Sequence, residues 1–198
     1  MEDRETRDRF ETEFPDEDDI IGDIAEGISL SPAEHERVKN LVHGQQFQGL
    51  TGFDRRYLVV GTGDSTAAGE RRQLVYDRLD SRTDPPAVAT QLEDYDLTKD
   101  EIRLWVRVFD ILCGLCTGIV AVIEDFDGGY VWELGLIFAP SYREKTWVLK
   151  RRYRDKQRER TKFSNGMAIS HVKLLLTGER AQEWTDRQEL REALKRIP

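Results

Sequence analysis

The chain has 198 residues, of which 38% are hydrophobic, and a formal net charge of −8. This length fits one domain with an extension and is enough to bury a core. No apolar run approaches the ~20 residues of a membrane span, and the first residues lack the basic and apolar regions of a signal peptide. We therefore expect a cytoplasmic protein with no membrane partner.

The charge is unevenly distributed. Residues 1–26 hold twelve acidic residues and three arginines, which leaves +1 for the rest of the chain. We expect this segment to be a disordered acidic tail, because it has few apolar residues. Residues 143–162 hold ten basic and three acidic residues. Such a stretch can bind phosphates or be simply solvated, but its few aromatic residues and the acidic tail argue against a nucleic-acid partner.

Residues 27–52 are predicted to form a helical extension and linker. Ser31 is a typical N-cap, Pro32 suits the first helical position, and Glu34 completes a capping box. We expect this helix to run to about Val42 and a linker to span residues 44–52.

Residues 53–198 alternate between strand-like and helix-like patterns. The predicted strands are 57–60, 87–92, 119–123, 146–149 and 171–176. The predicted helices are 67–79, about 102–116, a short helix around Glu133, and 181–196. This alternation predicts an α/β fold, a flavodoxin-like three-layer sandwich with a parallel sheet of about five strands, plus the N-terminal helical extension. Its site is expected at the C-terminal edge of the sheet.

The helix at 102–116 shows an apolar face at spacings of three and four, formed by Ile102, Trp105, Phe109, Leu112 and Cys116. Cys113 and Cys116 form a C-x-x-C in this apolar pattern, which we interpret as buried structural thiols. The three histidines are scattered, so the sequence predicts no metal site, and it indicates no cofactor.

The most informative segment follows the predicted strand 119–123. Asp125, Asp127, Gly128 and Gly129 mark a turn, and Glu133 is the single acid of the helix behind it. A helix N-terminus stabilises negative charge, so we expect Glu133 to be ionised near neutral pH. The alternative is a helix cap at Asp127 with Glu133 as an ordinary polar residue.

This segment resembles the D-x-G-x-x-x-E-x-G pattern of the nucleoside 2-deoxyribosyltransferase family, with Asp127, Gly129, Glu133 and Gly135 at the matching positions. The resemblance covers about residues 55–176 and extends to the wider TIR-like and SLOG-like nucleotide-binding domains. It implies that Glu133 is a nucleophile that attacks the anomeric carbon of a nucleoside, and that Asp127 shapes the same pocket. Asp125 is a second candidate for that supporting role.

The same resemblance implies roles for two further residues. Asp110 matches an aspartate that contacts the base, and its alternative is a polar residue on an exposed helix face. Asn165 matches an asparagine that reaches a neighbouring subunit's site, which implies a homo-oligomer. Its alternative is a plain Asn-Gly turn. The chain departs from the family where Leu58 and Thr62 replace a tyrosine and a proline, and Tyr57, one residue off, is expected to point away from the site.

The turn after the first predicted strand is Gly61-Thr62-Gly63-Asp64-Ser65. Its backbone N–H groups and hydroxyls are suited to a phosphate at a helix start, or they form only a turn and an N-cap. Two functions follow. One is N-glycosidic bond cleavage or deoxyribosyl transfer on a nucleoside or nucleotide. The other is a non-catalytic nucleotide-sensing module of the same fold.

Overall fold

A single parallel sheet organises the chain. The structure, a computed structural model, describes residues 29–63, 66–98, 100–127 and 130–198. Five strands pair in the order β2-β1-β3-β4-β5, all in parallel. The strands are β1 (Arg55–Gly61), β2 (Ala87–Thr90), β3 (Gly118–Ile123), β4 (Thr146–Arg151) and β5 (Ala181–Trp184). The predicted α/β, flavodoxin-like architecture is confirmed, because this strand order is the flavodoxin-like one.

The helices and one 3₁₀ turn connect these strands along the chain. They are α2 (Pro32–Val42), α3 (Gln45–Thr51), α4 (Ala67–Asp80), the 3₁₀ turn η1 (Leu92–Tyr95), α5 (Ile102–Leu115), α6 (Tyr130–Ile137), α7 (Pro140–Arg143), α8 (Lys156–Lys162), α9 (Gly166–Thr177) and α10 (Arg187–Leu194). No helix in these described ranges is long and apolar enough to cross a membrane.

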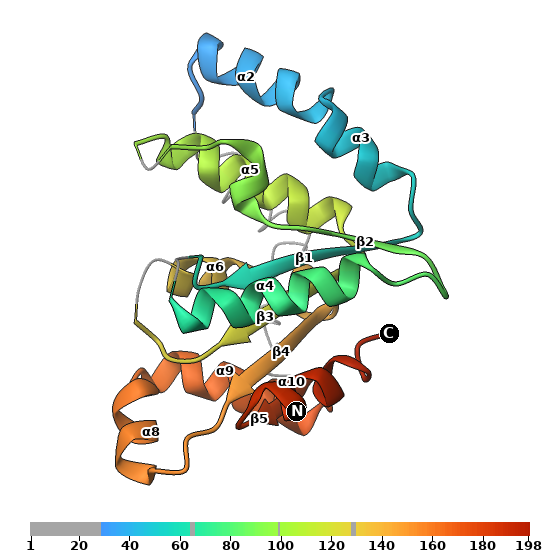
Figure 1. Ribbon diagram of the computed structural model, residues 1–198. Coiled ribbons are helices and arrows are strands. Elements are labelled where there is room, and N and C mark those ends of the chain that lie inside the picture. The colour runs from blue at the N-terminus through green and yellow to red at the C-terminus, as the bar shows by residue number, and fades with distance from the viewer. Residues whose placement is uncertain (1–28, 64–65, 99, 128–129) are drawn as a thin grey trace, which may run out of the picture.

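The sheet separates two hydrophobic cores, one on each of its faces. Leu58 and Val60 of β1 belong to the core that also holds buried residues of α5, α6 and α9. Tyr57 and Val59 belong to the other core, with buried residues of α4 and α10. Because side chains alternate faces along a strand, the sheet forms the middle of three layers (Figure 1). Tyr57 donates a hydrogen bond to the main-chain oxygen of Pro198, which fits the expectation that it points away from the site.

The N-terminal extension lies beside α5, near the β2 edge of the sheet (Figure 1). The predicted capping box is confirmed, since the Ser31 and Glu34 side chains each accept a hydrogen bond from the other residue's backbone N–H. The predicted linker at 44–52 is wrong, because α3 occupies most of it. Phe47 is buried against the ring of Tyr95 at a centroid distance of 4.8 Å, so packing stabilises a helix that the sequence pattern alone did not indicate.

The last two predicted elements are also wrong. Residues 171–176, predicted as a strand, lie in α9, where Ala168, Val172 and Leu175 are buried at helical spacing. A short apolar run does not distinguish a buried strand from a helix. The predicted helix 181–196 begins instead with edge strand β5, and Asp186 caps the shorter α10.

Two other predicted elements differ in detail. Strand β2 ends at Thr90, because Asp94 accepts hydrogen bonds from Thr90 Oγ1 and the Gln91 backbone and so starts η1. Helix α5 is confirmed, but its buried face runs through Leu104, Val108, Phe109, Leu112 and Cys113, while Ile102 is exposed.

Cys113 and Cys116 are buried free thiols as expected, and burial raises the pKa of both.

Candidate functional site

The candidate site lies where the strand order reverses, between β1 and β3. Gly61, the last residue of β1, pairs in register with Val122 near the end of β3. The chain leaves β1 toward α4 and leaves β3 toward α6, so the two connections diverge at this edge. Open α/β sheets bind ligands in the crevice at such a switch point, outside the carboxyl ends of the strands.

Glu133 lies in the first turns of α6 and is partly buried. Burial raises the pKa of its carboxyl from the ordinary 4.5 to about 8, the negative charge of Glu93 adds to this rise, and Arg72 opposes it. The expectation that Glu133 is ionised near neutral pH is therefore wrong. A helix N-terminus contributes about 1 kcal/mol, less than one pKa unit, and desolvation outweighs it.

Arg72 and Glu93 form an ion pair beside Glu133. Arg72, only 7% exposed, donates from Nη1 to both carboxylate oxygens of Glu93 at 2.8 and 3.0 Å and approaches the Gly61 carbonyl oxygen at 3.4 Å. Its Nε is buried and has no hydrogen-bond partner within the described ranges. A buried donor without an acceptor is costly, so this nitrogen is a candidate for contact with a ligand oxygen.

The glycine turn after β1 packs against this ion pair. A Cβ atom added to Gly63 would lie 2.0 Å from Glu93 Oε1 and 3.1 Å from Arg72 Nη2, so a larger residue there would displace the Glu93 carboxylate. Gly61 has a φ of +148°, and a Cβ there would lie 2.6 Å from the Val122 carbonyl oxygen. The structure thus brings Gly61 and Gly63 to the same place as Arg72, Glu93 and Glu133. Thr62 lies between the two glycines and is partly exposed.

Sequence reasoning missed Arg72 and Glu93. Glu93 lies in η1, three residues after the end of β2, and an acid near the carboxyl end of a parallel strand is a usable signal. The pattern of residues 87–92 predicts one continuous strand, which hides this signal. Arg72 carries no comparable signal, since its burial depends on how α4 packs on β1.

The two aspartates after β3 pair with a lysine of α8. Lys162 Nζ lies 2.9 Å from Asp125 Oδ2 and 3.4 Å from Asp127 Oδ2. Asp125 Oδ1 also accepts a hydrogen bond from the Asp127 backbone at 3.1 Å. The side chain of Asp127 is 76% exposed, and no hydrogen bond joins it to Glu133 in the part of the chain that the structure describes. A shared pocket for Asp127 and Glu133 stays a prediction.

Asp110 and Asn165 have local partners of their own. Tyr142 donates a hydrogen bond to Asp110 Oδ1 at 2.6 Å, which joins α5 to α7. Asn165 is the N-cap of α9, and its Oδ1 accepts from the Ala168 backbone at 3.1 Å. Both residues therefore have a structural role, and their contacts with a substrate or a neighbouring subunit stay predictions.

Four of the predicted site residues, Asp64, Ser65, Gly128 and Gly129, lie outside the described residues, as does the acidic tail at 1–26. Within the described ranges, no cluster of three or more histidine, cysteine, aspartate or glutamate side chains is placed to hold a metal ion. The basic stretch at 143–162 partly serves the fold: Lys150 is buried and pairs with Glu159 and Glu183, at 2.8 and 3.1 Å.

Comparison with known proteins finds a solved structure of similar fold and a matching family. A conserved protein of Enterococcus faecalis V583, known from a crystal structure, is similar over 73% of this chain and 99% of its own, with a TM-score of 0.50 and 12% sequence identity. At that identity the likeness concerns the fold alone. No curated protein matches the sequence significantly. The model of a family of unknown function, DUF8170, matches residues 11–198. This chain therefore belongs to the DUF8170 family.

Proposed function

We propose that this protein cleaves the N-glycosidic bond of a nucleoside or nucleotide, or transfers its deoxyribosyl group to another base, with Glu133 as the catalytic carboxyl group. One observation carries the proposal: Glu133 has its pKa raised to about 8 beside the Arg72–Glu93 ion pair at the switch point of the sheet. Carboxyl groups whose pKa is shifted by burial and by named charged neighbours are concentrated at functional sites.

The chemistry requires the bond between the anomeric carbon and the base nitrogen to break. The departing base takes the bonding electron pair, and the sugar acquires positive oxocarbenium character. An ionised Glu133 then donates an electron pair to the anomeric carbon, and water or a second base later displaces it. With a pKa of about 8, about a tenth of Glu133 is ionised at pH 7, which costs only about 1.4 kcal/mol.

The neighbours of Glu133 fit this role. Arg72 lowers the pKa of Glu133 and so favours the ionised form that attacks the sugar. We propose that the Arg72 Nε, which is buried and unpartnered in the described structure, donates to a sugar hydroxyl or a phosphate oxygen once substrate binding exposes it. Glu93 holds the Arg72 guanidinium in place through two hydrogen bonds. The substrate is a small molecule, and the proposal needs no cofactor.

We further propose that the active form is a homo-oligomer in which Asn165 lies near a neighbouring subunit's site. Met167 and Leu174, seven residues apart on α9, are large apolar side chains that are 75% and 53% exposed. Residues at this spacing share one helix face, and an apolar face next to Asn165 favours self-association. Light scattering should give at least a dimer, and a monomer at working concentration would contradict this assembly.

The activity is tested by incubating the full-length protein with a panel of nucleosides and 2′-deoxynucleosides, with and without an acceptor base, and measuring released base by chromatography. Glu133→Gln should lower turnover on the order of 10³-fold, and it should keep the fold because glutamine resembles the neutral carboxyl. Glu36→Gln, on the exposed face of α2, is the control and should leave turnover unchanged. Equal turnover in Glu133→Gln would exclude the catalytic role. Tight nucleotide binding without turnover would instead assign a sensing module.

A further inference from the structure

A cavity lies at the edge of the sheet where the strands begin, opposite the edge that carries Glu133. Its volume is about 700 Å³, and it is lined by residues from the start of β1, from α4 and the turn before β2, and from the C-terminal end of the chain. Arg55 begins β1 and lines this cavity, whereas Gly61 ends β1 beside Glu133. At about 3.3 Å per residue, the two ends of this strand are about 20 Å apart. The cavity is therefore separate from the candidate active site.

Basic side chains dominate the lining. Arg55, Arg78, Arg82, Arg191 and Lys195 line the cavity, against two acidic residues. A neighbouring cavity of about 420 Å³ between α4 and α10 shares Arg78 and Arg191 with it. Its other charged residues are Asp77 and the Glu70–Arg187 ion pair, so the excess of positive charge belongs to the larger cavity.

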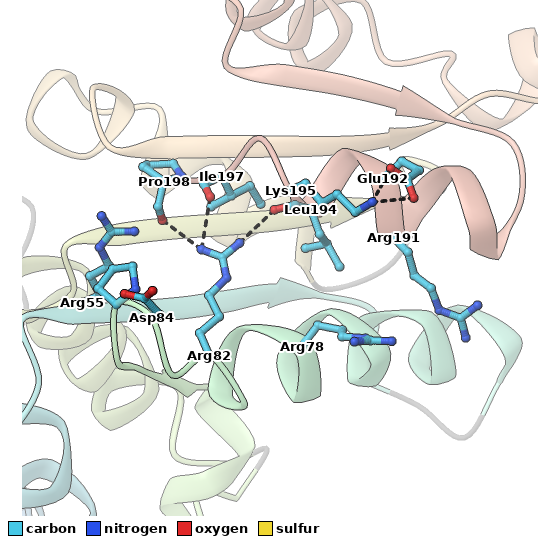
Figure 2. Close-up of a pocket in the computed structure, with 11 residues that line it drawn as sticks. Arg55, Arg78, Arg82, Asp84, Arg191, Glu192, Leu194, Lys195, Ile197 and Pro198 are labelled. Carbon is cyan, nitrogen blue, oxygen red and sulfur yellow. Dashed lines mark hydrogen bonds and ion pairs between the residues drawn. The ribbon is translucent and has the colours of Figure 1, made fainter.

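Two of the basic side chains are committed to structural contacts. Arg82 donates to the main-chain oxygens of Leu194, Ile197 and Pro198, at 2.8 to 3.1 Å, and so fixes the C-terminal segment (Figure 2). Lys195 pairs with Glu192, one of the two acids, at 2.6 Å. These contacts build the wall of the cavity.

The other three basic side chains have no such contacts. Within the described residues, Arg55, Arg78 and Arg191 make no hydrogen bond or ion pair through their side chains, although all three line the cavity. In Figure 2, Arg82 lies between Arg55 on one side and Arg78 and Arg191 on the other. Isolated surface arginines are ordinary, but three unpaired guanidinium groups around one hollow repel one another and attract anions.

We propose that this cavity binds a small anion with a diphosphate or longer phosphate chain, either free or as part of a nucleotide. Guanidinium groups bind phosphate oxygens through paired, charge-assisted hydrogen bonds, and arginine suits this better than lysine. The volume lies within the range of small-molecule sites. Because three unpaired guanidinium groups line the hollow, a ligand with several charged oxygens offers them more acceptors than a single phosphate ion does. The proposal does not depend on any activity of Glu133.

The test is calorimetric titration of the full-length protein with inorganic pyrophosphate at low salt, because screening weakens such contacts. The double variant Arg78→Gln/Arg191→Gln should weaken binding by about tenfold or more, since hydrogen bonds to charged groups are the strong ones. The matched control Arg154→Gln/Arg160→Gln removes the same charge from exposed residues outside this cavity and should change affinity by less than about twofold. A parallel titration with a nucleoside diphosphate separates the two sources: tighter binding than pyrophosphate indicates a nucleotide, and equal binding indicates the free anion.

Three results would overturn the proposal. The first is no binding of pyrophosphate or the diphosphate by the unaltered protein. The second is an equal loss of affinity in the control variant, which would mean that net charge alone is responsible. The third is tighter binding of a short single-stranded oligonucleotide than of either small ligand, with this binding lost in the same double variant. That result would assign the cavity to nucleic acid.

Discussion

Arg72 in α4 donates two hydrogen bonds from one guanidinium nitrogen to the carboxylate of Glu93, which follows β2. This contact joins two residues that lie 21 positions apart in the sequence, and it places one positive and one negative charge within electrostatic reach of Glu133. The two charges act in opposite directions on that carboxyl group. The protonation of Glu133 is therefore set by burial first and then adjusted by this ion pair.

The ion pair gives a prediction for the pKa of Glu133. In Glu93→Gln, the pKa of Glu133 should fall from about 8, because the negative charge that raises it is removed. In Arg72→Gln, it should rise, because the opposing positive charge is lost. The measurement is an NMR titration of ¹³C-labelled glutamate carboxyl groups, assigned with Glu133→Gln. Shifts in the same direction in both variants would contradict the arrangement.

Stability should depend on pH through Glu133. Its pKa is about 8 in the folded protein and 4.5 in an ordinary environment, so between these values the unfolded chain releases a proton that the folded protein keeps. The stability that Glu133 contributes is thus present below about pH 4.5 and is lost as pH rises toward 8. Compared with the unaltered protein, Glu133→Gln should be similarly stable near pH 5 and more stable near pH 8 by on the order of 3 kcal/mol. The measurement is urea unfolding of both proteins across this pH range. If the free energy of unfolding changed with pH in parallel in the two proteins, Glu133 would not be the cause of the dependence.

The buried carboxylate at the end of β3 should contribute more to the free energy of unfolding than an exposed carboxylate does. Glu124, 5% exposed, pairs with both Arg71 and Arg151. Glu124→Gln leaves two arginines without their charged partner and should lower the free energy of unfolding by about 3 kcal/mol. The matched control is Glu70→Gln, which breaks the exposed pair with Arg187 and should cost less than about 1 kcal/mol. Equal melting temperatures for the two variants would show that the Glu124 cluster contributes no more than a surface pair.

Two glycine-to-alanine changes should have opposite effects on the free energy of unfolding. Gly61→Ala puts a Cβ 2.6 Å from the Val122 carbonyl oxygen at a φ of +148°, so it should destabilise the protein by about 1 to 3 kcal/mol. Gly49→Ala, in α3 with nothing within 4 Å, should stabilise it by about 0.5 to 1 kcal/mol. Thermal unfolding measures both. A neutral Gly61→Ala would mean that the approach of β1 to β3 relaxes at no cost.

Four of the five strands of the sheet, β1 to β4, could be predicted from the sequence because their signals are local. All six residues of β3 are buried, and a strand buried on both faces is a continuous apolar run. The capping box at Ser31 likewise depends on residues three positions apart. The two failures near the chain's end have different causes. The apolar run in 171–176 fits a helix or a strand equally well, whereas Ala181–Trp184 is a short, partly polar segment that forms a strand by pairing with β4.

The candidate site was predictable only in part. Glu133 and the glycine turn stand out, because single polar residues and glycines after apolar strands are visible in the sequence. The protonation of Glu133 was not predictable, since it depends on how deeply α6 is buried and on Glu93 and Arg72. Asn165 shows the same limit: its hydrogen bond to Ala168 depends on α9 being a helix.

If Glu133 is the nucleophile that we propose, it forms a covalent bond to the anomeric carbon of a nucleoside. Intact-protein mass spectrometry, followed by peptide mapping, measures this directly after rapid acid quenching of a reaction with whichever substrate releases base. We expect a mass increase equal to one sugar residue, located on the peptide that contains Glu133, with no increase in Glu133→Gln. Release of base at full rate without any adduct on that peptide, or with an adduct on another residue, would contradict it.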